Sequence, residues 1–243
     1  MAPAIVAGME LRVEWLGRIG YQAAWDRQHE LVAARAQGRA PDTLLLLEHD
    51  AVLTLGRHAD PSHVLAPSAL LEARGIAVLH VERGGEVTYH GPGQLVAYPI
   101  VRLADAGLLL RPFVRALEGA MADVAATYGV AADRRDGYPG CWTALDTPFP
   151  RKLGALGLRV EKGITYHGIA LNITTDLADF GLIDPCGMTG LSVTSIAREL
   201  GWTGDAARPD TAGVEVAGRR YAALLHERLA VAVRDSARQT TAA

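Results

Sequence analysis

The chain has 243 residues, of which 49% are hydrophobic and 21% are charged. It can therefore bury roughly 70–75% of the surface that it exposes when unfolded, which excludes a disordered or fibrous protein. The net charge of -3 argues against a nucleic-acid partner, because proteins that bind nucleic acid usually carry a basic excess. We expect one globular catalytic domain over residues 1–243.

Apolar alternation and helical periodicity predict the elements of the first half of the chain. In order, they are a strand at 11–15, a helix at 21–37, strands at 43–47 and 51–55, a short helix at 67–74, and strands at 76–81 and 94–101. His49 is expected in the turn between two of these strands. Pro99 indicates a sheet edge or a strand end, because proline cannot donate a ladder hydrogen bond.

The second half begins with the longest amphipathic pattern. In order, we predict a helix at 108–128, a polar and turn-rich stretch to about residue 151, strands at 155–160 and 164–173, and helices at 192–200 and 214–235. Residues 236–243 are expected to form a frayed tail, and residues 201–213 are the nearest approach to a joint. Helices do not follow every strand and several strand pairs resemble hairpins, which predicts an α/β (α+β) fold with a mixed sheet flanked by helices.

The cysteines and the N-terminus indicate the expected cell compartment. Cys141 and Cys186 are the only cysteines, and without a CxxC pair they fit neither a zinc site nor a disulfide-stapled secreted fold. The N-terminus lacks the basic region of a signal peptide, and no apolar run reaches ~18 residues. The eight histidines show no HExxH spacing. We expect a cytoplasmic protein with no metal site and no membrane partner.

A glycine-rich segment, RGGEVTYHGPGQ, occupies residues 83–94. It has neither the spacing of a Rossmann fingerprint nor the ending of a P-loop, so we do not expect it to cradle a phosphate. Glycine lets bare backbone approach a ligand closely, and the neighbouring side chains offer polar and aromatic contacts. The candidate ligand-contacting residues are Arg83, Gly84, Gly85, Thr88, Tyr89, His90, Gly91 and Gln94. A tight hairpin without a ligand explains the glycines equally well.

Three further side chains are chemical candidates. Cys186 lies between Pro185 and Gly187, in a turn that can hold a thiol away from regular backbone, although a buried structural cysteine is the simpler interpretation. Lys152, one of only two lysines, enters a run of small and apolar residues. An amine that loses solvent in this way becomes a better general base, whereas an isolated lysine is usually a surface residue. His167 can orient a reacting group, or it can be a satisfied core residue.

Taken together, these segments resemble one family, the lipoyl(octanoyl) transferases, also called lipoate-protein ligase B type enzymes. The resemblance extends from about residue 11 to residue 200 and follows the family's motif order. The motifs are LLLLEHDAVLTLGR (44–57), RGGEVTYHGPGQLVAYPI (83–100), GCW (140–142), RKLGALGLRV (151–160), YHGIALNITTDLADF (166–180), PCG (185–187) and VTSI (193–196).

The resemblance implies the catalytic fold of biotin and lipoate protein ligases. It also implies that Cys186 accepts an octanoyl group as a thioester and that Lys152 is the general acid and base. The residues implied to line the acyl and pantetheine channel are His49, Arg83, Gly84, Gly85, His90, Leu153, Gly154, Ala155, Leu156, Gly157, His167, Gly168, Ile169 and Ala170.

The same resemblance implies the partners. The donor would be octanoyl-phosphopantetheine on acyl carrier protein, and no cofactor, ATP or metal would be needed. The acceptors would be lipoyl domains of 2-oxo acid dehydrogenase acyltransferase subunits and the glycine cleavage H protein, and the enzyme would be a monomer. Two positions depart from the family pattern: Asp50 replaces the usual Pro, which predicts a looser turn at His49, and Gly154 replaces a frequent Ala, which predicts a slightly wider pocket. Cys141 is expected to be a packed free thiol.

Three other functions fit these residues less well. An ATP-dependent lipoate or biotin ligase on the same fold is disfavoured by the presence of both Cys186 and Lys152 and by TYHGPGQ in place of the ligases' nucleotide-binding pattern. A non-catalytic acyl- or carrier-binding module would be expected to have lost one of the two residues. A metal hydrolase lacks its ligand spacing.

Overall fold

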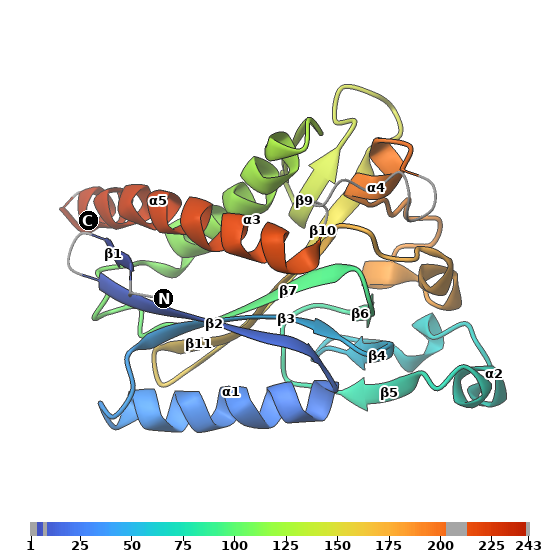
Figure 1. Cartoon of the computed structure of the whole chain (residues 1–243), viewed down its shortest axis with the longest axis horizontal. Helices are drawn as coiled ribbons and strands as arrows, with labels where there is room; N and C mark the ends of the chain where they lie inside the picture. The colour runs from blue at the N-terminus through green and yellow to red at the C-terminus, as the bar shows by residue number, and fades with distance from the viewer. Residues whose placement is uncertain (1–3, 7–8, 203–212, 242–243) are drawn as a thin grey trace.

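Two β-sheets and their flanking helices make up the described part of the chain, residues 4–6, 9–202 and 213–241, in this computed structural model (Figure 1). The strands are β1 Ala4–Val6, β2 Met9–Ile19, β3 Asp42–His49, β4 Val52–Leu55, β5 Ala77–His80, β6 Val87–His90, β7 Gln94–Ile100, β8 Ala132–Arg135, β9 Tyr138–Thr143, β10 Arg151–Glu161 and β11 Ile164–Asn172. The helices are α1 Tyr21–Ala36, α2 Ser68–Ala73, α3 Leu110–Thr127, α4 Ile196–Glu199 and α5 Val214–Thr241, with short 3-10 turns η1 Pro61–His63, η2 Ala178–Leu182 and η3 Pro185–Gly187.

The larger sheet is mixed, which confirms the predicted fold class. Its strand order is β1-β2-β3-β7-β11-β10-β9-β8, and β2 and β3 are its one parallel pair among the described strands. The smaller sheet has the order β5-β4-β6. In Figure 1, α3 and α5 lie above the larger sheet and α1 lies below it. The sheet is thus covered on both faces.

Coverage on both faces explains the uninterrupted apolar run in β3. Successive strand residues point to opposite faces, so a strand that is half-exposed alternates and one buried on both sides does not. Leu44 and Leu46 pack in the cluster that contains α3 and α5, whereas Leu45 and Leu47 pack in the cluster that contains α1. All four leucines are almost fully buried.

Pro99 marks a strand end, as one of the two predicted alternatives had it, because β7 ends at Ile100. The other alternative, a sheet edge, is wrong, because β7 lies between β3 and β11. The strand tolerates the proline because β11 pairs with β7 only as far as Ala97. Beyond that point the Thr165 hydroxyl donates to the Pro99 carbonyl oxygen at 2.6 Å and accepts from the Val101 N–H at 3.1 Å. A side chain therefore satisfies the backbone where the strand ladder stops.

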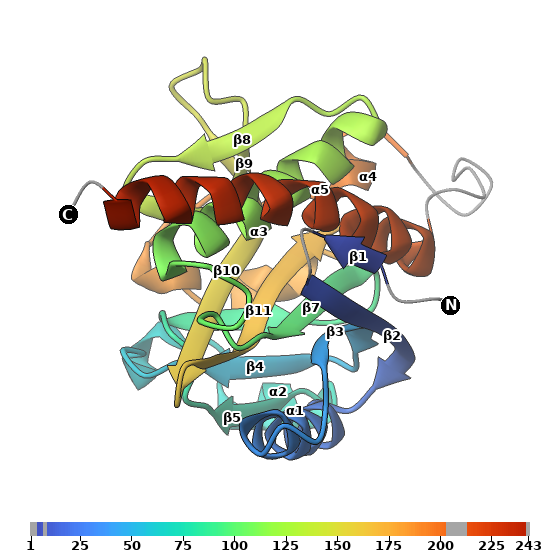
Figure 2. The same ribbon diagram turned by 90° about the vertical axis from the view of Figure 1, so that its left-hand side faces the viewer.

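The turn-rich stretch before residue 151 contains a hairpin that the sequence analysis missed. Strands β8 and β9 pair around Asp136-Gly137, with Arg135 opposite Tyr138. A two-residue Asp-Gly loop is a strong hairpin signal, and Gly137 has the positive φ of 78° that such a turn requires. In Figure 2 the hairpin lies at the top of the molecule, beside α3.

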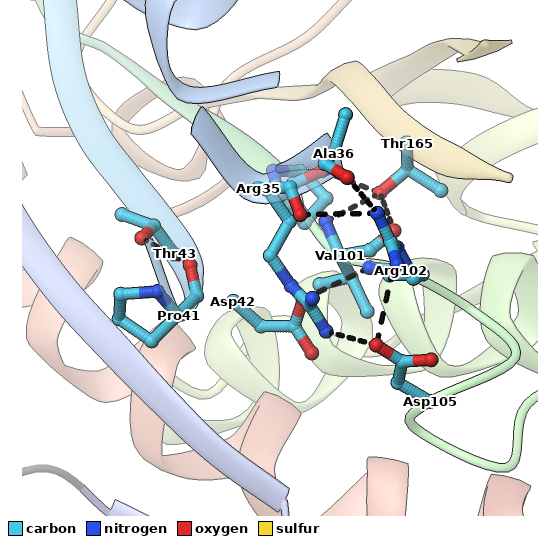
Figure 3. A network of polar contacts seen from close by, with 10 residues as sticks. Arg35, Ala36, Pro41, Asp42, Thr43, Val101, Arg102, Asp105 and Thr165 are labelled. Atoms are coloured by element: carbon cyan, nitrogen blue, oxygen red, sulfur yellow. Dashed lines mark hydrogen bonds and ion pairs between the residues drawn. The ribbon is translucent and has the colours of Figure 1, made fainter. Parts of the chain in front are cut away.

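The end of α1 is tied to the sheet by charged side chains (Figure 3). Arg35 donates to Asp42 at 2.6 Å and to Asp105 at 2.8 Å. Arg102 donates to the carbonyl oxygens of Arg35 and Ala36, which have no partner within the helix. These bonds fix α1 against the strands that carry part of the candidate site.

The C-terminal helix differs from its prediction. Helix α5 continues to Thr241, beyond the expected frayed tail at 236. Ser236 anchors this part, because its hydroxyl donates to the Ala232 carbonyl oxygen and accepts from the Leu109 N–H. The predicted joint at 201–213 lies largely outside the described residues. Within the described residues, no helix is long and apolar enough to cross a membrane.

Candidate active site

Cys186 lies in a strained turn that holds its thiol away from regular structure. Pro185 precedes it, and Cys186 itself has φ 60° and ψ 21°, in the left-handed region that non-glycine residues rarely adopt. Gly187 follows with φ 65°. Backbone strain of this kind is characteristic of functional sites, where the surrounding structure maintains it. Here the Asp184 N–H donates to the carbonyl oxygen of His63, which fastens the turn to its neighbour.

Lys152 meets this thiol from the start of β10. Its Nζ lies 3.2 Å from the Cys186 Sγ, and the side chain is only 8% exposed. The same nitrogen also lies 5.1 Å from the centre of the Trp142 ring. The Lys152 N–H donates to the Ser192 carbonyl oxygen, and its own carbonyl oxygen accepts from Thr194. Two backbone bonds thus set the position from which the amine reaches the sulfur.

Gly140 makes room for the Lys152 side chain and Glu118 binds Gly140, and neither was among the predicted site residues. Gly140 has φ 118°, and a Cβ there would overlap the Gly154 carbonyl oxygen and lie 3.2 Å from the Lys152 Cε. Glu118 of α3 is buried and accepts from the Gly140 N–H at 2.8 Å. Burial raises the pKa of Glu118, and this bond opposes that rise. The available signal for Glu118 was a carboxylate among the apolar residues of the helix face that packs on the sheet.

Two cavities meet at the Lys152–Cys186 pair. Both cavities have Thr88, Lys152, Ala155, Ala170 and Cys186 in their walls. Predicted residues in the walls of the first are Arg83, Gly85, Thr88, His90, Lys152, Ala155, Leu156, Gly157, His167, Gly168, Ile169, Ala170 and Cys186. Predicted residues in the walls of the second are Thr88, Gln94, Lys152, Gly154, Ala155, Ala170 and Cys186. Wall residues that the sequence analysis missed are Tyr21, Glu86, Val87, Tyr98, Asn172, Phe180, Pro185 and Val193.

Five predicted channel residues do not face either cavity. These are His49, Gly84, Tyr89, Gly91 and Leu153. Successive strand residues point to opposite faces. Leu153 follows Lys152 in β10, and Tyr89 lies between Thr88 and His90 in β6, so both point away from the cavities. A Cβ on Gly91 would strike the Tyr89 ring, so this glycine packs against a side chain and not a ligand. The Gly84 N–H donates to the Leu158 carbonyl oxygen.

His49 is the fifth of these residues, and it supports the cavity wall from behind. It ends β3, so it is not in the turn where it was expected. Its Nε2 lies 2.8 Å from the Tyr98 hydroxyl, and its Nδ1 lies 3.1 Å from the Ile19 carbonyl oxygen. Burial lowers the pKa of His49 to about 4, so the ring is neutral at pH 7.

Arg83 brings a buried cation to the first cavity. Its guanidinium donates to the Thr54 hydroxyl and carbonyl oxygen and to the Gly84 carbonyl oxygen. It forms no ion pair within residues 4–6, 9–202 and 213–241. Burial lowers the pKa of Arg83, but an arginine remains charged in a protein. A permanent positive charge therefore stands in the wall that also contains Cys186.

His167 is held in an unusual conformation by Gln28 of α1. The residue has φ 53°, and its N–H donates to the Gln28 Oε1 at 2.7 Å. Its ring is 1% exposed, with Nδ1 3.5 Å from the Tyr21 hydroxyl and Nε2 without a partner in the described structure. Burial lowers the pKa of His167 to about 3. A neutral imidazole thus lies in the cavity wall with one buried nitrogen that has no partner in the described structure.

A chain of amides connects the glycine-rich segment with the strand of Lys152. His90 Nδ1 lies 2.7 Å from the Gln94 Oε1, and Gln94 donates to Asn172 at 2.9 Å. Asn172 donates to the Thr194 carbonyl oxygen, and the Thr194 N–H donates to the Lys152 carbonyl oxygen. Asn172 and Thr194 were not among the predicted site residues, although each lies in a quoted motif. A buried amide in an apolar strand was the available signal.

The two departures from the family pattern do not have the predicted effects. The Asp50 N–H donates to the Ile19 carbonyl oxygen, and the Asp50 side chain pairs with Arg18 at 2.8 Å, so the turn is tied and not loosened. At Gly154, a Cβ would lie 2.8 Å from the Met121 sulfur on the α3 side of the sheet. The missing methyl group of Gly154 therefore makes room for Met121 and does not widen the pocket.

Cys141 is a different kind of thiol. It is fully buried and unpaired, and burial raises its pKa to about 12, so it is a packed free thiol as predicted. Among the described residues, no three His, Cys, Asp or Glu side chains gather in a way that could hold a metal ion.

Comparison with known proteins places the chain in a family. The family described as "Lipoyl protein ligase A/B catalytic domain" matches residues 20–213. Octanoyltransferase of Chloroflexus aurantiacus is 50% identical over 192 residues, which cover 79% of this chain and 85% of that protein. Octanoyltransferase of Mycolicibacterium gilvum is 48% identical over 205 residues, covering 84% and 82%.

Solved structures agree on the fold. A bi-partite lipoate protein ligase from Thermoplasma acidophilum superimposes with a TM-score of 0.60 over 93% of this chain and 91% of that one, at 15% identity. The chain belongs to the family of lipoyl protein ligase A/B catalytic domains. Within that family it is an acyltransferase, similar to the octanoyltransferases.

Proposed function

We propose that this enzyme transfers an octanoyl group from the phosphopantetheine thioester of acyl carrier protein to the target lysine of a lipoyl domain. The main support is the 3.2 Å approach of the Lys152 Nζ to the Cys186 Sγ where two cavities meet. A nucleophile beside a base, with space on both sides, suits a reaction in which one substrate leaves before another enters. The names of the relatives support the octanoyl group.

In the first half-reaction, Lys152 accepts the thiol proton and the Cys186 sulfur attacks the thioester carbonyl carbon. Cations stabilise a thiolate, and Lys152 and Arg83 both supply positive charge at the cavity wall. The bond between the carbonyl carbon and the donor sulfur then breaks, and Lys152 returns the proton to that sulfur. The products are an octanoyl thioester on Cys186 and free pantetheine thiol.

In the second half-reaction, the amine of the acceptor lysine attacks the Cys186 thioester. The new bond is an amide, the bond to the Cys186 sulfur breaks, and Lys152 relays the amine proton to the leaving thiolate. A thioester is already activated, so neither half-reaction requires ATP. The second cavity, which includes Ala155, Phe180 and Val193, is the apolar space proposed for the acyl chain.

The test is intact mass measurement after mixing the protein with octanoyl-acyl carrier protein without ATP. Wild type should gain one octanoyl group that hydroxylamine removes, and Cys186→Ala should gain none. Cys141→Ala is the matched control, because it removes the buried thiol and should be acylated like wild type. Cys186→Ser should bind the donor and fail to turn over.

Two results would count against this mechanism. Full turnover by Cys186→Ser would exclude the thioester intermediate. Wild type that acquires no adduct from an intact donor over varied trapping times, and that consumes ATP with free octanoate, would indicate a ligase.

A further inference from the structure

A groove outside the two catalytic cavities lies between the first half of α3 and the β8–β9 hairpin. It contains about 1080 Å³ of space, including the open solvent at its mouth. We call it the arginine groove, because its walls include Arg111, Arg115, Arg134 and Arg135. The region where α3 and the hairpin pack together can be followed in Figure 2.

The arginine groove is basic in a chain whose net charge is -3. Its four arginines face two carboxylates, Glu118 and Asp136. Arg111, Arg115 and Arg134 are exposed, and their side chains make no hydrogen bond or ion pair with any residue that the structure describes. Burial raises the pKa of Glu118, and Arg115 and Arg134 lie near enough to lower it through their charge. Four arginines around a hollow with only two carboxylates leave an excess of positive charge, which attracts a negatively charged partner.

The rest of the arginine groove has the composition of a protein interface. Arg135 stacks over the Tyr138 ring at 4.0 Å, and Tyr138 and Leu110 are 38% and 47% exposed in the groove wall. Arginine and aromatic residues are enriched at protein interfaces, and exposed apolar residues beside them supply contact area. A protein surface fits this groove better than a small ion.

The arginine groove adjoins the catalytic cavity at one residue of β10. Leu156 belongs to the walls of both. Strand β9 pairs with β10 only from Arg151 to Gly154. The next backbone bond on this edge of β10 is at Leu158, whose carbonyl oxygen accepts from the Gly84 N–H. The edge between Gly154 and Leu158 is therefore open. The groove and the thiol thus lie on either side of a short open edge.

We propose that the arginine groove docks an acidic surface of the carrier protein that delivers the acyl group, a proposal that rests on the proposed function. The donor protein is favoured over the acceptor protein as the occupant of this groove, because its prosthetic arm spans a longer distance to Cys186. The acceptor lysine is short and must dock at the mouth of the cavity, whereas a donor on a prosthetic arm can dock around the edge of β10. The phosphate of that arm is also an anion that arginine binds.

The test is the double variant Arg111→Glu, Arg134→Glu, compared with Arg39→Glu, which reverses an exposed charge after α1. Initial rates are measured with octanoyl-acyl carrier protein and with octanoyl-pantetheine as donors. The double variant should raise the KM for the carrier-linked donor at least tenfold and weaken its salt dependence. Rates with octanoyl-pantetheine and the KM for the lipoyl domain should match wild type. Unchanged rates with octanoyl-pantetheine would also show that Cys186 and Lys152 are undisturbed.

Three results would overturn the assignment. They are an unchanged KM for the carrier-linked donor, an equal loss with both donors, or a raised KM for the lipoyl domain alone, which would make the arginine groove an acceptor surface. Wild type that transfers from neither donor would refute the proposed function, and the docking proposal with it. Wild type that transfers from octanoyl-pantetheine while the double variant behaves normally with both donors would refute the docking proposal alone.

Discussion

Replacing Gln28 with Met should destabilise the protein through a residue that touches no substrate. The Gln28 Oε1 is the acceptor for the His167 N–H at 2.7 Å, and both side chains are almost fully buried. Met has a similar length but no acceptor, so a buried N–H would lose its partner. Such a loss costs about 1–3 kcal/mol. At the usual scaling for a chain of this size, Tm should fall by roughly 2–12 °C.

Urea unfolding of Gln28→Met measures the loss, and amide hydrogen exchange locates it. Exchange at the His167 N–H should accelerate, because its acceptor is gone and the left-handed backbone is no longer held. Gln22→Met is the matched control: Gln22 lies on the same helix but is exposed, so its replacement should change stability by less than about 0.5 kcal/mol. If Gln28→Met were as stable as this control, the proposed role of Gln28 would be wrong.

Two further predictions concern the lysine and the buried histidines. Gly140→Ala should lower the rate of Cys186 acylation and cost about 2–5 kcal/mol of stability. The new Cβ would overlap the Gly154 carbonyl oxygen, and alanine would have to adopt the positive φ of Gly140. Acylation at the wild-type rate would contradict this prediction. His49 stays neutral in the fold down to its pKa of about 4, but takes up a proton below about pH 6.5 when unfolded, so acidification from pH 6.5 to 4 should weaken the fold. His49→Gln should flatten that pH dependence by about 1.4 kcal/mol per pH unit, measured by urea unfolding across this range, and an unchanged slope would contradict it.

The local pattern of the sequence predicted most elements correctly. The helical spacing before Gly38 matches α1, and the apolar run at 43–47 matches β3. Local signals were weaker where side chains from elsewhere complete the structure. For Pro99 the sequence left a sheet edge open beside a strand end, because the Thr165 hydroxyl that satisfies the backbone around it is 66 positions away.

The family resemblance, carried by motifs spread along the chain, names Cys186 and Lys152 as a pair, whereas the local pattern around each residue left a purely structural role open. Motifs do not show which neighbours of Lys152 face the cavities. Strand alternation and the irregular pairing between Lys152 and Gly154 determine which side chains face the cavities, and they direct Leu153 toward the hydrophobic core.

The supporting residues emerge only from the tertiary structure. Gln28 and His167 are 139 positions apart, and nothing in either local segment indicates that they meet. Glu118 and Gly140 come together because α3 packs against β9. Chemical identity is carried by short segments, whereas burial, left-handed backbone and hydrogen-bond partners depend on contacts between segments that only folding brings together.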